Sequence, residues 1–296
     1  MPELPDVTVY VERLAQRSVG QVLRRVQLLN PFVLRTAVPP IASAQGRRVL
    51  GVERLGKRVV LCLDGELFLV LHLMIAGRLR WLAPAAKSPG KIALVRLDFD
   101  DGSLLFTEAG SQRRASLHLV QGRAALAALD AGGLDVLRCD GADFGERLRS
   151  ENHTLKRALT DPRLFSGIGN AYSDEILHRA RLSPLALTRA LGDEDVRRLH
   201  EATRAVLDEW TARLRDEADR AGGWPDKVTA FHPQMAVHGR FGQPCPDCGS
   251  PVQRIVYASN ECNYCARCQT GGRLLADRSL SRLLKASWPK HLDELG

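Results

Sequence analysis

Five of the seven cysteines in this 296-residue chain lie between residues 245 and 268. Cys245-Pro-Asp-Cys248 and Cys265-Ala-Arg-Cys268 are two C-x-x-C knuckles with sixteen residues between them. Each knuckle turns two thiolates toward one point, so four sulfurs can surround a Zn²⁺ ion, and this spacing is typical of a zinc ribbon. Cys262 also forms a C-x-x-C with Cys265 and is the competing ligand, but we favour the first four and interpret Cys262 as a spare thiol. Because four thiolates leave no open position, the predicted zinc is structural.

The N-terminus is a second candidate reagent. Removal of Met1 would leave Pro2 with a secondary amine, whose pKa of about 8 can be lowered toward neutrality by its surroundings. Such an amine can attack the anomeric carbon of a sugar and form a charged iminium. Glu3 and Asp6 follow directly, so one carboxyl group can protonate the opening sugar while the other orients it or holds charge. On the alternative interpretation, these two acids only complement the dipole of a helix that begins there.

The elements that would position this amine are mostly strands. Short apolar runs occur between residues 47 and 107, and the Asp64-Gly65 and Asp101-Gly102 pairs between them are strong hairpin signals. Residues 7–19 carry apolar side chains at helical spacing and can cover one open face of the resulting sheet. The sequence therefore predicts an N-terminal antiparallel β-sandwich with a flanking helix, over residues 1–123.

From residue 124 onward the pattern is helical. Helices are predicted at 151–160, 170–182 and 193–220. A stretch with Gly and Pro at 221–225 then precedes the cysteines. We predict a helical domain at 124–228, a zinc ribbon with a β-hairpin at 235–270 and a tail of unassigned role at 271–296. The tail is expected to contain one short helix carrying Leu280, Leu283, Leu284 and Trp288.

The composition narrows the class of partner. Lys and Arg outnumber Asp and Glu by 42 to 34, a net charge of +8 that favours a polyanion such as nucleic acid. No apolar stretch approaches the roughly 20 residues of a membrane span. The acidic, Pro-interrupted start also lacks the features of a signal peptide, so we expect a cytoplasmic protein with no membrane partner.

Five motifs occur in one order along the chain. They are Met1-Pro-Glu-Leu-Pro-Asp6, Arg54-Leu-Gly-Lys57, His72-Leu73 with Gly77, Gly167-Ile-Gly-Asn-Ala-Tyr172 with Asp174-Glu175, and the ribbon from His238-Gly-Arg240 to Gln269. Together they resemble the formamidopyrimidine-DNA glycosylase and endonuclease VIII family, over residues 1 to about 270. The resemblance implies an α+β fold with a helix-two-turn-helix element and a zinc finger. It also implies a monomeric repair enzyme that excises damaged bases from double-stranded DNA, cleaves the strand, and associates with the bacterial nucleoid when bound.

The resemblance also implies roles for particular residues. Pro2 corresponds to the proline that attacks C1′, and Glu3 to the glutamate that assists ring opening and proton transfer. Lys57 corresponds to a lysine that binds phosphate and takes part in proton transfer during elimination. Asp6 stands where the family usually has Glu, and is included in the catalytic group. Asn170 is expected to grip phosphate at a helix N-terminus, with Lys156 and Arg157 on the preceding helix adding to this contact.

A base in a duplex must be flipped out before it can be excised, and inserted side chains then fill the gap. The resemblance assigns this task to Met74 or Ile75 and to Arg113. Ala115 stands where the family has Phe and is too small to intercalate.

Asn260 occupies the position of the arginine in the family's ribbon. The cationic phosphate contact of that arginine is therefore missing, unless Arg254 or Arg267 supplies it. We therefore expect base removal and β-elimination more firmly than δ-elimination, and the lesion is left unassigned. Two other classes explain part of the sequence. One is a damaged-DNA-binding module of the same fold without turnover, and the other is a zinc-ribbon RNA-binding or transcription factor, which leaves Pro2 and Lys57 without a task.

Overall fold

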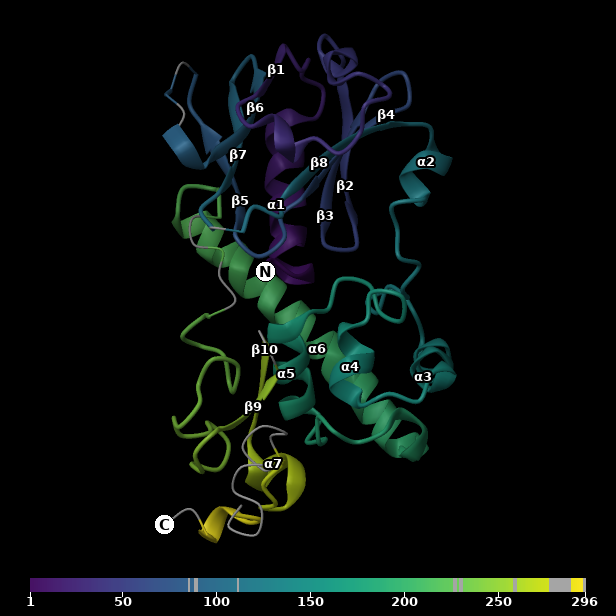
Figure 1. Cartoon of the computed structure of the whole chain (residues 1–296), viewed down its shortest axis with the longest axis vertical. Coiled ribbons are helices and arrows are strands. Elements are labelled where there is room, and N and C mark those ends of the chain that lie inside the picture. The colour runs from purple at the N-terminus through teal and green to yellow at the C-terminus, as the bar shows by residue number, and fades with distance from the viewer. Residues whose placement is uncertain are drawn as a thin grey trace. The chain divides into compact units, whose positions relative to one another are not determined.

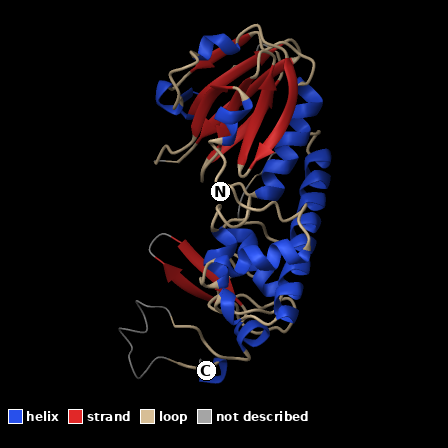
Figure 2. Cartoon of the chain, turned by 90° about the vertical axis from the view of Figure 1, so that its right-hand side faces the viewer, coloured by secondary structure: helices blue, strands red, loops and turns tan. Residues whose placement is uncertain are grey.

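The computed structural model describes residues 1–84, 86–87, 90–110, 112–225, 228, 231–257, 260–276 and 289–294. The chain forms two compact units (Figure 1). Unit 1 comprises Met1–Ala131 and Trp210–Thr229, and unit 2 comprises Gly132–Glu209 and Ala230–Gly296. Most of the described strands lie in unit 1 and most of the described helices lie in unit 2 (Figure 2), so the expected α+β class is confirmed.

Unit 1 contains two four-stranded antiparallel sheets. The first has the order β1 (Arg25–Leu28), β6 (Ala93–Phe99), β7 (Gly102–Glu108) and β5 (Gly77–Leu82). The second has the order β2 (Val49–Leu55), β3 (Arg58–Leu63), β4 (Leu67–His72) and β8 (Ser116–Gln121). Both predicted hairpins form, with Gly65 at φ +72° in the β3–β4 turn and Gly102 at φ +158° where β7 begins.

One core lies between the two sheets. Helix α1 (Leu4–Ser18) packs into it through Val7, Tyr10 and Leu14, against inward-facing residues of both sheets. The opposite face of the second sheet is also covered, because Phe68 and Val70 pack with Leu126 of helix α2 (Arg123–Ala127). Covering on both faces explains why β3 and β4 read as continuous apolar runs rather than alternating ones.

Unit 2 is built from helices and one hairpin. The helices are α3 (Gly141–Ser150), α4 (Leu155–Thr160), α5 (Asn170–Arg179), the first part of α6 (Asp193–Arg220) and α7 (Ala266–Thr270). The hairpin pairs β9 (Gln253–Tyr257) with β10 (Asn260–Tyr264). Short 3₁₀ turns are η1 (Pro31–Val33), η2 (Ile41–Ala44) and η3 (Gly90–Ile92) in unit 1, and η4 (Thr188–Ala190) and η6 (Leu292–Glu294) in unit 2.

Several predicted boundaries differ from the structure. The helix expected from residue 151 begins only at Leu155, because the Thr154 side chain accepts a hydrogen bond from the Arg157 N–H and caps the helix there. The helix expected to reach 182 ends at Arg179, and Arg181 has a left-handed backbone at φ +53°. Strands β1, β5 and β8 were not predicted, because polar residues such as Arg78, Arg80 and His118 interrupt their short apolar runs.

The short helix predicted around Leu280 to Trp288 lies outside the described residues. Within the described part of the tail, Arg273 forms an antiparallel bridge with His291. None of the helices in the described ranges is long and apolar enough to cross a membrane.

Candidate active site and DNA interface

The start of the chain is folded into unit 1. Pro2 is buried, and the side chains of Glu3 and Asp6 belong to residues only 1% and 6% exposed. The Glu3 N–H donates to Asp6 Oδ2 at 2.8 Å, so Asp6 caps the first turn of α1 and fixes the backbone of Glu3. Burial raises the pKa of Asp6 to about 7, far above its ordinary 3.8. Asp6 therefore has the helix-terminus role that the alternative interpretation gave it, inside a buried cluster of acids.

The terminal amine lies among four charged side chains. This amine belongs to Met1, and burial lowers its pKa below the ordinary 8.0. The nearby Glu3 and Asp6 carboxyl groups raise this pKa, whereas the cations Arg78 and Lys57 lower it. Lys57 reaches this place from the β2–β3 turn, where Gly56 adopts φ +61°. The residues predicted as catalytic thus lie near the start of the chain in unit 1.

Arg78 is a member of this cluster that the sequence analysis missed. Its Nη1 donates to the carbonyl oxygens of Ile75 (3.1 Å) and Gly77 (2.7 Å), so it also holds the β4–β5 loop. A single arginine beside a glycine at the start of a strand gives no recognisable signal in one sequence.

Two loops of unit 1 carry the predicted gap-filling residues. In the β4–β5 loop, Ile75 is 60% exposed, whereas Met74 is half-buried and has φ +52°. Ile75 is therefore the better placed of the two for insertion. Arg113, on the β7–β8 loop, is exposed and its Nη2 donates to the Lys91 carbonyl oxygen at 3.1 Å.

The β7–β8 loop is fixed by Glu108, a second residue that the sequence analysis missed. Glu108 is 2% exposed, and its Oε1 accepts hydrogen bonds from the N–H groups of Arg114 (3.0 Å) and Ala115 (3.2 Å). The Ala115 methyl group is consequently buried, with the residue 3% exposed. It is both too short and wrongly placed to enter a DNA stack.

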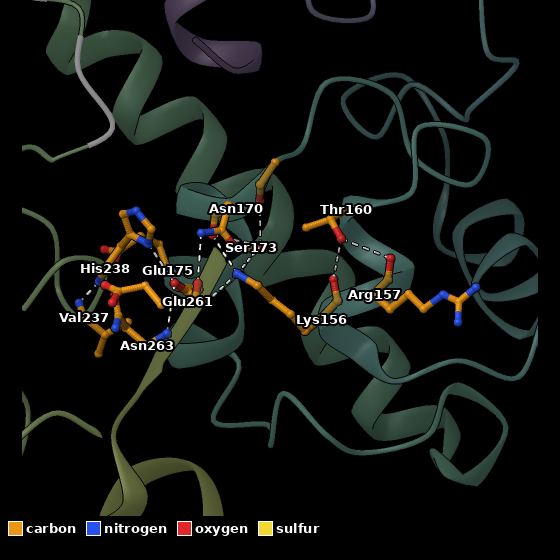
Figure 3. A network of polar contacts seen from close by, with 12 residues as sticks. Lys156, Arg157, Thr160, Asn170, Ser173, Glu175, Val237, His238, Glu261 and Asn263 are labelled. Atoms are coloured by element: carbon orange, nitrogen blue, oxygen red, sulfur yellow. Dashed lines mark hydrogen bonds and ion pairs between the residues drawn. The ribbon is translucent and has the colours of Figure 1, made fainter. Parts of the chain in front are cut away.

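In unit 2, Lys156 is the centre of a buried polar network (Figure 3). Its Nζ donates to the Asn170 carbonyl oxygen at 2.7 Å, to Ser173 Oγ at 2.8 Å and to Asp174 Oδ1 at 2.6 Å. The side chain is 12% exposed and that of Asp174 is fully buried. All three ammonium donors are thus used inside the protein, an arrangement that favours a supporting role over the predicted phosphate contact.

The carboxylates that follow in α5 connect three segments of unit 2. Asp174 Oδ2 lies 2.7 Å from His238 Nδ1 and accepts from the Asn263 N–H at 3.1 Å. Glu175 accepts from the successive N–H groups of residues 236, 237 and 238, at 2.6–3.0 Å (Figure 3). These contacts explain why the Asp174-Glu175 pair belongs to the Gly167–Tyr172 motif: it joins α5 to the segment before the ribbon and to β10.

The other predicted phosphate contacts lie at the hairpin. Asn170, the first residue of α5, donates from Nδ2 to the Glu261 carbonyl oxygen at 2.9 Å. Arg254 lies 4.3 Å above the ring of Phe241, and its Nη1 is 3.5 Å from Glu261 Oε2. Arg267 is exposed on α7, while the side chain of Asn260 lies outside the described residues. Asn170 on α5 and Arg254 on β9 therefore both contact Glu261 of β10.

The four predicted zinc ligands converge. The Sγ atoms of Cys245, Cys248, Cys265 and Cys268 all lie within 4.8 Å of one another. Two of the separations are 3.4 and 3.9 Å, close to the roughly 3.8 Å expected for thiolates at 2.3 Å from a tetrahedral Zn²⁺. This donor set is compatible with a single zinc ion. Cys262 instead packs in a separate apolar cluster with Ile255 and Tyr264, as the choice of ligands required.

His178 is a third residue that the sequence analysis missed. It projects from α5, is 4% exposed, and places Nε2 3.3 Å from Cys245 Sγ. An imidazole N–H directed at a zinc thiolate would orient that ligand and reduce its charge. Because the histidine stands 67 residues before the cysteine, spacing within the ribbon could not reveal it.

Comparisons with known proteins decide the family. Residues 1–114 match the model of the formamidopyrimidine-DNA glycosylase N-terminal domain, and residues 136–215 match that of the formamidopyrimidine-DNA glycosylase H2TH domain. Formamidopyrimidine-DNA glycosylase of Thermus thermophilus is 37% identical over 283 residues, which are 92% of this chain and all of the relative. The chain belongs to the formamidopyrimidine-DNA glycosylase family. The formamidopyrimidine-DNA glycosylase of Heliobacterium modesticaldum is 35% identical over 283 residues, which are 91% of this chain and all of the relative.

Solved structures of this family have the same fold. The MutM (Fpg) protein of Thermus thermophilus superposes with a TM-score of 0.75 at 34% identity, covering 90% of this chain and 98% of the other. MutM in complex with DNA containing carbocyclic 8-oxo-G gives 0.80 at 24% identity, covering 91% and 100%. The second likeness concerns the fold alone. The expected family and its β-sandwich fold are both confirmed.

The buried position of Asp6 predicts a pH dependence of stability. Its pKa in the folded protein, about 7, exceeds its ordinary value, so the folded state binds the proton more tightly and its stability falls as the pH rises from about 4 to about 7. Asp6→Asn keeps an oxygen for the Glu3 N–H but cannot ionise. Between pH 5 and pH 8 we expect the wild type to lose about 2–3 kcal/mol more of its free energy of unfolding in urea than the variant loses. Identical pH dependences would contradict this.

The Lys156 network predicts a structural penalty. Lys156→Met leaves the Asp174 carboxylate buried without its cation, which should lower the free energy of unfolding by about 3–5 kcal/mol. Adding Asp174→Asn should recover part of the loss. Arg157→Met, at an exposed neighbour on the same helix, is the matched control and should change stability by less than about 0.5 kcal/mol. Urea unfolding checks all three, and a Lys156→Met protein as stable as the wild type would show that the lysine serves ligand binding instead.

Proposed function

We propose that this protein is a base-excision DNA glycosylase with an associated abasic-site lyase activity, and that the amine of Pro2 is its nucleophile once Met1 has been removed. The observation that carries the proposal is the folded start of the chain: the amine of Met1 is half-buried near Glu3, Asp6 and Lys57, and burial lowers its pKa. Removal of Met1 would expose the Pro2 amine beside the same side chains. An amine attacks carbon only when it is neutral, so a lowered pKa increases the reactive fraction near pH 7. The names of its relatives support the same reaction class.

In the proposed reaction, the Pro2 nitrogen forms a bond to C1′ of the damaged nucleotide while the bond from C1′ to the base breaks. The base leaves with that electron pair and takes up the proton that the Pro2 nitrogen loses, which restores the lone pair on that nitrogen. Glu3 protonates the ring oxygen O4′, the ring opens, and the nitrogen lone pair completes a positively charged iminium. The cap from Asp6 holds the Glu3 backbone in place for this transfer.

The iminium makes the C2′ proton acidic and so permits β-elimination. Loss of that proton forms a double bond between C2′ and C3′, and the bond from C3′ to its phosphate oxygen breaks. Lys57 is proposed to bind this phosphate and to assist proton transfer. Hydrolysis of the iminium then returns the free amine of Pro2. A second elimination is left out of the proposal, since Asn260 occupies the position of the family's ribbon arginine.

Duplex DNA with a damaged or abasic nucleotide is the proposed substrate. Two solved proteins of the same fold support this choice: MutM is in complex with DNA containing carbocyclic 8-oxo-G, and the Lactococcus lactis formamidopyrimidine-DNA glycosylase is bound to DNA with an abasic site. We propose that Ile75, which is more exposed than Met74, and Arg113 enter the gap, while Asn170 and Arg254 contact phosphates. Lys156 is proposed to position Asn170 by donating to its carbonyl oxygen.

The four-cysteine cluster is proposed to hold one structural Zn²⁺ that folds the ribbon and presents Arg254. Cys245, Cys248, Cys265 and Cys268 supply a closed shell of thiolates, which suits folding and leaves no position for substrate. The domain limits 1–123, 124–228, 235–270 and 271–296 stay predictions.

Borohydride trapping tests the lyase proposal. Reduction during incubation with abasic duplex should convert the iminium into a stable cross-link, seen as a slower band on a denaturing gel. Pro2→Gly replaces the secondary amine with a primary one and should slow trapping about 10-fold or more. Mass spectrometry of the N-terminus is the control, because a retained Met1 would leave residue 2 as an amide. Correctly trimmed protein that binds the duplex but never cross-links would favour the damage-binding module without turnover.

The zinc proposal predicts a link between metal content and DNA binding. Cys248→Ser should lower zinc below one equivalent and weaken binding to abasic duplex, because the ribbon loses its folding energy. Cys62→Ser, in the apolar cluster beneath α2, is the matched control and should retain one zinc. Elemental analysis and a binding titration report the two effects. DNA affinity that survives complete zinc removal would contradict the proposed role of the ribbon.

A further inference from the structure

Three segments of unit 1 adjoin one another in a row. The β4–β5 loop, which carries Ile75, touches the β7–β8 loop, since a Cβ built on Gly110 would lie 3.1 Å from the Cβ of Ala76. The β7–β8 loop in turn adjoins the turn η1, because Phe32, Arg113 and Ala115 line one cavity. Ile75 and Phe32 thus belong to opposite ends of a row of loops with Arg113 between them.

Phe32 is unusually exposed for its residue type. Its exposure is 83%, compared with 67% for Phe231 and 50% for Phe241. An aromatic ring left in water forgoes the burial that usually stabilises it, so such a ring on a fixed support indicates a binding surface. Arg35, three residues later, is also exposed and adds positive charge to the same turn.

The backbone under Phe32 is held firmly. The Asn30 side chain accepts from the Phe32 N–H at 3.1 Å, and the Asn30 N–H donates to the Leu94 carbonyl oxygen of β6 at 3.0 Å. On the other side, the Arg35 N–H donates to the Leu117 carbonyl oxygen of β8 at 2.9 Å, and Val33 is buried. The ring is therefore presented by a turn that is bonded to both sheets.

A base-flipping enzyme must support the stack from which a nucleotide has left. Neither the β4–β5 loop nor the β7–β8 loop contains an aromatic residue, and the Ala115 methyl group is buried. Ile75 supplies one aliphatic wedge but no stacking surface. An aromatic face can stack on any base, because every base has a π-face.

We propose that Phe32 stacks on the DNA strand opposite the lesion, against the base left unpaired by flipping, while Ile75 and Arg113 fill the vacated position. The proposal rests on the proposed function for its substrate, a duplex with one extruded nucleotide. It adds a contact to the undamaged strand, made by a segment outside the loops that the sequence analysis singled out. Val38, 84% exposed in the same segment, is aliphatic and does not line the cavity with Arg113.

The test compares Phe32→Ala, Phe32→Trp and the matched control Val38→Ala on three DNAs. The first is a duplex with a non-cleavable abasic analogue opposite 2-aminopurine, the second is a duplex with a natural abasic site, and the third is the same abasic strand without its partner. Loss of one stacked base should weaken duplex binding by Phe32→Ala about 5- to 100-fold. It should also raise the bound-state fluorescence of 2-aminopurine, while Phe32→Trp and Val38→Ala stay within about twofold of the wild type.

Borohydride trapping on the single strand separates this proposal from the proposed function. There Phe32→Ala should react as fast as the wild type, because no opposite base is present. Wild-type duplex affinity and unchanged 2-aminopurine fluorescence in Phe32→Ala would overturn the stacking contact. An equal loss of affinity for single-stranded and double-stranded DNA in this variant would also overturn it. Failure of the wild type to cross-link any DNA would remove the lyase mechanism, while a selective loss of duplex binding in Phe32→Ala would still establish the contact.

Discussion

The chemistry that we propose for this protein depends on keeping a terminal amine neutral beside acids that must donate protons. Water would stabilise the ammonium form, so the amine has to be partly buried, and burial of the same site raises the pKa of Asp6 to about 7. Two opposite pKa shifts thus have one cause. Unit 1 positions these groups: Pro2 and Glu3 lie directly before α1, Asp6 is in its first turn, and the β2–β3 turn brings Lys57 near the amine.

Unit 2 contains many charged groups, and the most buried of them act on the protein itself. Lys156 neutralises Asp174, and Glu175 accepts three successive backbone N–H groups that would otherwise be unsatisfied. In this way the helix that begins at Asn170 is joined to β10 and to the segment before the ribbon. His178, on the same helix, contacts Cys245 of the four-cysteine cluster. The proposed phosphate contacts therefore stand on a rigid polar framework, which limits the entropy lost on binding DNA.

The sequence was sufficient wherever the signal is local. The convergence of the four cysteines, the hairpin turns at Gly65 and Gly102 and most of the N-terminal helix all follow from residue type and spacing. It was insufficient where a contact joins distant segments, as for Glu108 with its loop or His178 with Cys245, and where distant residues line one cavity, as Phe32 and Arg113 do. Lys156 illustrates the difference: its position beside a phosphate-binding motif predicted a DNA contact, whereas burial next to Asp174 gives it an internal partner.

The most direct test of the account is the identity of the atom that bonds to the sugar. The borohydride-reduced adduct with abasic duplex can be digested and the modified peptide sequenced by mass spectrometry. We predict that the deoxyribose remnant is attached to the nitrogen of Pro2 in a peptide that lacks Met1. Attachment to Lys57 or to any other lysine, with the amine of Pro2 unmodified, would contradict the account.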